Sequence, residues 1–103
     1  MRKGELPVVK ETVFIVSEEN HGTIGVAVSP EAAARFIINE GWITLDDDIW
    51  CYAKKETVFV HEAMAEHGYD KEDLLGFCTD MFSGKYAEEH DWCFYISERV
   101  CYH

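Results

Sequence analysis

Residues 11–41 read ETVFIVSEENHGTIGVAVSPEAAARFIINEG, and they contain two runs of residue types that favour strands. Residues 12–16 and 24–28 are rich in valine, isoleucine and other β-branched or aromatic residues, which fit a pleated, half-buried surface. Asn20 and Gly22 lie between the two runs, where an antiparallel hairpin needs a turn. We therefore expect two strands near these runs, paired as a hairpin.

A helix is expected near residues 30–40, directly after the second run. Ser29 can accept a hydrogen bond from the first helical turn, and Pro30 suits the first helical position. Gly41 can adopt the left-handed conformation that commonly ends a helix. Four apolar residues recur at helical spacing and form the face expected to pack on the sheet: Ala32, Ala33, Phe36 and Ile37.

The rest of the chain predicts a short strand and two more helices. Residues 49–52 can form the strand. Apolar residues at helical spacing indicate helices near 57–67 and 70–83, with Asp70 as the cap of the second. The connection between these helices is short, which favours their packing as a helical hairpin. The order of elements predicts the α+β class, with a small antiparallel β-sheet and about three packed helices.

The composition indicates one small globular domain covering residues 1–103. Of the 103 residues, 48% are hydrophobic and 14% aromatic, which is far from the composition of disordered chains. No apolar run reaches the roughly 18 residues of a membrane span, and no apolar stretch of the signal-peptide type follows Met1. We therefore expect a cytoplasmic protein without a membrane partner, whose four cysteines are free thiols or metal ligands.

The charge is strongly one-sided, with 9 basic and 20 acidic residues and a net charge of -11. Such a surface repels nucleic acid and attracts basic surfaces, although acidity also serves solubility alone. Most of the three tryptophans are expected in the core, and one exposed beside acids would anchor a partner. The densest acidic runs are the expected contacts with a basic protein: Asp46, Asp47, Asp48, Glu88, Glu89 and Asp91.

Cysteine and histidine concentrate in residues 90–103. A turn at residues 97–99 would fold this segment into a hairpin with Cys93, Cys101 and His103 on one face. Side chains opposite or diagonal across two strands lie about 5–8 Å apart between Cβ atoms, a separation that suits tetrahedral zinc. The sequence therefore predicts a structural zinc site on this hairpin.

The fourth zinc ligand is open between three residues. His90, three residues before Cys93, is the first choice, and Cys51 or Cys78 can take its place. The alternative is that the cysteines are free thiols and the histidines lie on the surface, since free cysteine behaves as a small hydrophobic residue.

No motif nominates an enzyme. His61 and His67 are six residues apart, whereas the zinc-protease motif needs histidines four apart on one helical face. The sequence contains no phosphate-binding loop, dinucleotide fingerprint or nucleophile elbow. We therefore expect a protein without catalytic activity, with a small metal-dependent enzyme as the less favoured alternative.

The chain resembles the small anti-CRISPR proteins of phages and mobile elements, which inhibit type II RNA-guided nucleases. The likeness covers size, acidic balance, a hairpin feeding a capped helix that ends in Asn39-Glu40-Gly41-Trp42, and the acidic second half from Asp46 to Asp91.

The resemblance implies a phage protein in the host cytosol that inhibits by protein–protein interaction. Such inhibitors present carboxylates where the nuclease would hold nucleic acid, or bind an accessory lobe and stop DNA loading. The nuclease holds its heteroduplex in a positively charged channel, for which a rigid acidic surface can compete. The alternative is a zinc-stabilised adaptor or regulator that binds another basic host protein.

Overall fold

The computed structural model describes residues 10–102, which form two three-stranded antiparallel sheets and three helices, an α+β fold. The first sheet contains β1 (Lys10–Glu18), β2 (Gly22–Ala27) and β6 (Phe94–Tyr102) in the order β2-β1-β6. The predicted first hairpin is confirmed, with Phe14 opposite Ala27 and Glu18 opposite Gly22.

Helix α1 (Pro30–Asn39) begins where the sequence predicts, because Ser29 Oγ accepts a hydrogen bond from the backbone N–H of Ala32 at 3.0 Å. The helix packs against one face of the first sheet at Gly25. A Cβ atom at this glycine would lie 2.8 Å from a ring carbon of Phe36. Any side chain here would force the Phe36 ring to shift, and glycine lets the strand and the helix approach this closely without that shift.

The second sheet contains β3 (Asp48–Cys51), β4 (Glu56–Phe59) and β5 (His90–Asp91) in the order β4-β3-β5. The short strand near residues 49–52 is confirmed, and it lies at the centre of this sheet.

The prediction of helix over residues 57–59 is wrong, because these residues belong to β4 and α2 (Val60–Glu66) begins only after them. Val58 is buried between exposed neighbours and pairs with Ile49. Burial here alternates with the two-residue period of a strand.

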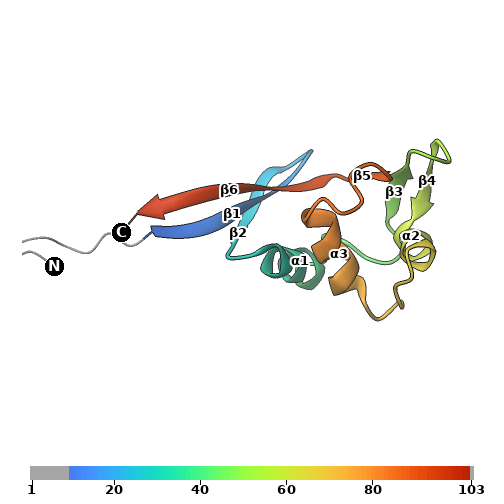
Figure 1. Ribbon diagram of the computed structural model, residues 1–103, viewed down its shortest axis with the longest axis horizontal. Coiled ribbons are helices and arrows are strands. Elements are labelled where there is room, and N and C mark those ends of the chain that lie inside the picture. The colour runs from blue at the N-terminus through green and yellow to red at the C-terminus, as the bar shows by residue number, and fades with distance from the viewer. Residues whose placement is uncertain (1–9, 103) are drawn as a thin grey trace, which may run out of the picture.

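Helix α3 (Leu74–Phe82) starts four residues later than predicted. Its cap is Asp73, whose carboxylate accepts a hydrogen bond from the Gly76 N–H at 3.0 Å. Asp70 instead contributes its backbone carbonyl to the preceding turn, accepting from Asp73 N–H at 2.9 Å. The predicted hairpin of α2 and α3 is also wrong, because α3 packs on α1 (Figure 1).

The predicted C-terminal hairpin is absent, since Phe94–Tyr102 is one continuous strand. It pairs with β1 along its whole length, from Glu18 opposite Phe94 to Lys10 opposite Tyr102. The expected turn at residues 97–99 lacks the glycine that tight hairpin turns favour. The long free edge of β1 offers a better partner than a local fold-back.

The core lies where the three helices pack against the two sheets, and it includes Val16, Ile37, Ile49, Met64 and Phe77. Beyond the end of β2, β1 and β6 continue as a two-stranded ribbon that projects past the helices (Figure 1). No helix within residues 10–102 is long and apolar enough to cross a membrane.

Candidate functional site

The two predicted acidic runs flank the same strand, β3. Asp48 is its first residue, and Asp46 and Asp47 directly precede it. The second run leads into β5, where Asp91 pairs with Trp50 of β3. Asp91 therefore lies beside the strand that begins at Asp48, whereas Glu89 lies at the other end of β3, where its carbonyl accepts from Tyr52 N–H at 3.0 Å.

Hydrogen bonds hold the loop before β3 in a defined shape. The Asp47 carboxylate accepts from Thr44 N–H at 2.6 Å, and Thr44 Oγ1 accepts from Asp46 N–H at 3.3 Å. The Asp47 carbonyl accepts from Val60 N–H at 2.8 Å, which ties the loop to the start of α2. The Asp48 carboxylate has no partner among residues 10–102, and it is therefore available to a ligand.

A cleft of about 170 Å³ opens beside this loop, between the segment after α1 and the connection from β5 to β6. A buried cavity of about 150 Å³ can hold a molecule the size of benzene, so the cleft can admit one planar or branched side chain. Its walls combine tryptophans with carboxylates: Trp42, Ile43, Asp47, Asp48, Trp92, Cys93 and Phe94. We call this the Trp–Asp cleft.

Neighbouring rings brace both tryptophans of the Trp–Asp cleft. The His21 ring meets Trp42 edge to face, with ring centroids 5.1 Å apart. Trp92 packs against Phe82 at 4.9 Å and against Phe94 at 5.1 Å between centroids. The aromatic walls are therefore fixed before any ligand enters.

The electrostatic field in the Trp–Asp cleft is negative. Burial, the largest cause, and the carboxylates of Glu18, Glu19 and Asp47 together raise the pKa of the Cys93 thiol to about 11. The backbone also holds Glu19 next to Cys93, because Glu19 N–H donates to the Cys93 carbonyl at 2.9 Å. The Cys93 thiol therefore stays protonated and is a poor nucleophile.

Glu18 contributes a fixed negative charge despite its burial. Its carboxylate bonds to the His21 ring and accepts from Asn20 N–H, and the hydrogen bond from His21 lowers the pKa of Glu18. Aromatic faces and carboxylates together favour a cationic group, either guanidinium or ammonium. Sequence reasoning missed Glu18 and Glu19 because their approach to Cys93 depends on the pairing of β1 with β6.

The structure does not gather the predicted zinc ligands. Cys93 and Cys101 stand eight residues apart along one extended segment, a span of about 26 Å at about 3.3 Å per residue. His103 lies outside the described residues. His90 and Cys51 are cross-strand partners, whereas Cys78 is buried in α3 and desolvation raises its pKa to about 12. Across residues 10–102, no three histidine, cysteine or acidic side chains converge on one point.

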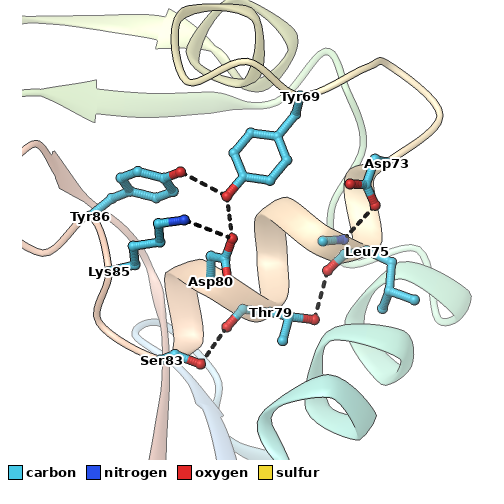
Figure 2. Close-up of polar contacts among 9 residues, drawn as sticks. Tyr69, Asp73, Leu75, Thr79, Asp80, Ser83, Lys85 and Tyr86 are labelled. Carbon is cyan, nitrogen blue, oxygen red and sulfur yellow. Dashed lines mark hydrogen bonds and ion pairs between the residues drawn. The ribbon is translucent and has the colours of Figure 1, made fainter.

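A second polar cluster anchors the loop between α2 and α3, and its polar groups are hydrogen-bonded or ion-paired with one another (Figure 2). The Tyr69 hydroxyl bonds to the Asp80 carboxylate and lies 2.7 Å from the Tyr86 hydroxyl, while Lys85 Nζ lies 3.7 Å from Asp80. Desolvation and the bond to Asp80 raise the pKa of Tyr69, so its phenol remains a donor. A hollow of about 350 Å³ adjoins this cluster, but its central polar groups are already paired. The Trp–Asp cleft is therefore the stronger candidate.

No protein-family model, curated protein or solved structure matches this chain.

Proposed function

We propose that this protein is a non-catalytic binding protein that recognises a basic protein surface. The observation that carries the proposal is the Trp–Asp cleft, which two braced tryptophans line together with Asp47 and Asp48. An arginine or lysine of the partner enters the cleft, stacks on the rings and pairs with Asp47 and Asp48. The other acidic residues around β3 face the basic surface around that side chain.

The partner that best fits this chemistry, together with the resemblance in the sequence, is a type II RNA-guided nuclease. Its nucleic-acid channel is positively charged and reads backbone shape. A surface of net charge -11 is attracted to the channel or its rim and competes with DNA for it. Bound there in the cytosol of the host, the protein blocks engagement or loading of DNA.

Rigidity of the site supports tight binding. The loop before β3 is held by hydrogen bonds within itself and to the start of α2, and the tryptophans are packed by their neighbours. A preformed surface loses less conformational entropy on association than a flexible one.

The proposal is tested by measuring binding to a guide-loaded type II nuclease and inhibition of its DNA cleavage. The variant Asp47→Asn/Asp48→Asn neutralises the cleft while keeping an acceptor for Thr44 N–H. The control Asp70→Asn/Glu72→Gln removes the same charge from an exposed loop remote from β3. We expect the cleft variant to bind and inhibit far more weakly than the control.

Two results would contradict the proposal at different levels. Equal weakening by both variants would show that net charge, and not the cleft, drives binding. A wild-type protein that neither binds nor inhibits such nucleases would remove the nuclease as partner. A pull-down from host lysate with the wild type and the cleft variant would then test the more general adaptor function.

A further inference from the structure

Two histidines from different parts of the fold meet at the edge of the second sheet. His67 caps the C-terminal end of α2, and His90 lies in β5. Their Nε2 atoms are 2.9 Å apart, and their rings are perpendicular. His90 is 4% exposed and His67 is half-buried, so the contact is only partly shielded from water.

The hydrogen bond on the far side of His90 fixes its tautomer. His90 Nδ1 lies 3.1 Å from the Trp50 carbonyl oxygen, and because a carbonyl only accepts, Nδ1 must carry the hydrogen. In the neutral ring, Nε2 then holds a lone pair that points toward His67. Metal-bound histidines typically have this arrangement, with one nitrogen on the metal and the other donating to a carbonyl.

His67 is held in place from two sides. Its backbone N–H donates to Ala63 and Met64 carbonyls at 3.2 Å, and its ring stacks on Tyr86 with centroids 4.0 Å apart. Tyr86 is itself bonded to Tyr69 in the cluster of Figure 2. Both imidazole rings are therefore restrained close to one another before an ion arrives, which reduces the entropic cost of binding.

The separation of the two nitrogens fits adjacent positions on a metal ion. With metal–nitrogen bonds of about 2.0–2.1 Å, nitrogens 2.9 Å apart subtend about 90° at the ion. This angle suits square-planar or octahedral coordination, as in copper(II) and nickel(II). Tetrahedral zinc requires the nitrogens to open to about 3.3 Å, a movement of a few tenths of an ångström.

Carboxylates adjoin both histidines in the sequence. Glu66 directly precedes His67 but forms an ion pair with Lys54, whereas Glu89 directly precedes His90 and is exposed. Within residues 10–102, Glu89 is therefore the nearer source of uncompensated negative charge for a dication, and water can complete the coordination.

We propose that His67 and His90 form a binding site for one divalent transition-metal ion that prefers imidazole ligands. To bind, His67 moves its hydrogen from Nε2 to Nδ1, so both Nε2 lone pairs reach the ion without net proton loss. The site retains His90 from the ligands that the sequence predicts and replaces the cysteines with His67. It is independent of the proposed function of the Trp–Asp cleft.

The test is calorimetric titration of nickel(II) into the full chain at neutral pH. A Cys101→Ser background removes the exposed thiol as a competing ligand. We expect one ion per chain and affinity at least about tenfold weaker in His67→Gln, because losing an outer hydrogen bond alone costs about 10–100-fold. The control His61→Gln removes an imidazole outside the pair and should change affinity less than about twofold.

Histidine NMR signals provide a second measurement that does not rely on a substitution. Substoichiometric nickel(II), which is paramagnetic, should broaden the His67 and His90 signals before those of the other histidines. Earlier broadening of another histidine would overturn the proposal. So would wild-type affinity in a folded His67→Gln variant, or the absence of binding by the wild type.

Discussion

Pairing of β6 with β1 places residue 11 directly opposite Cys101, and Glu11→Cys should therefore form a disulfide with it. Directly opposed residues in antiparallel strands have Cα atoms about 4.5–5.5 Å apart, within the about 4.4–6.8 Å that a disulfide spans. The hairpin expected from the sequence would instead place Cys101 opposite Tyr95, far from residue 11.

The magnitude of the stabilisation follows from the size of the closed loop. Linking residues 11 and 101 closes a loop of about 90 residues, for which chain entropy gives about 4.6 kcal/mol. Engineered disulfides usually deliver less, and we expect about 2–4 kcal/mol. For a domain of this size, that corresponds to a rise in melting temperature of at least about 8 °C.

The assay compares oxidised and reduced protein by gel mobility without reductant and by denaturant unfolding. The matched control is Val13→Cys, whose partner on β6 is Arg99 and which lies diagonal to Cys101. Glu11→Cys should cross-link rapidly and unfold later when oxidised, whereas the control should remain reduced. The strand register would be refuted if Val13→Cys cross-linked as readily as Glu11→Cys, or if neither variant cross-linked.

Three further outcomes are expected. Gly25→Ala should lower the free energy of unfolding by about 1–3 kcal/mol, because its Cβ would press on the aromatic ring from α1; chemical denaturation measures this, and a stabilised variant would contradict the close packing. Asp73→Ala should lower it by about 1 kcal/mol through loss of the α3 cap, while Asp70→Ala should cost less than about 0.5 kcal/mol; equal losses would contradict the assignment of the cap. Alkylation at pH 8 should modify Cys101 first, because the pKa of Cys93 is about 11 and only about 0.1% of the Cys93 thiol is ionised. The alkylation rate of Cys93 should rise about tenfold per pH unit up to pH 10. Mass spectrometry of digested peptides measures the order of modification, and a reversed order would contradict the burial of Cys93.

The elements predicted correctly depend on signals close together in the sequence. Ser29 and Pro30 mark the start of α1 through bonds within one turn. The first hairpin joins neighbouring runs through a short connection that ends at Gly22, whose φ of 71° suits glycine. Such local choices are decided mainly by residues a few positions away.

The errors arose where neighbouring signals were ambiguous or where the partner was distant. Residues 57–59 suit both a strand and the edge of a helical stripe, and pairing with β3 decides between them. Asp70 and Asp73 are both acceptable caps, and only Asp73 bonds to the helix. β6 pairs with a strand about 85 residues earlier, a choice that no local pattern specifies.

The Trp–Asp cleft was predicted only in its parts. The sequence nominates Asp46–Asp48 and suggests that a tryptophan beside acids would anchor a partner. It does not indicate that Trp42 and Trp92 line one cleft together with Asp47 and Asp48. That arrangement requires both the second sheet and the pairing of β6 with β1.

Residues 90–102 close both sheets, since β5 joins the second sheet and β6 joins the first. Folding rates fall as contacts become more distant in sequence, and these two pairings include the most distant contacts of the fold. We expect their docking to be the late, rate-limiting event of folding. On the ribosome, a chain lacking this segment has neither sheet complete and no Trp92 in its cleft. The same short segment therefore completes both sheets and the wall of the Trp–Asp cleft.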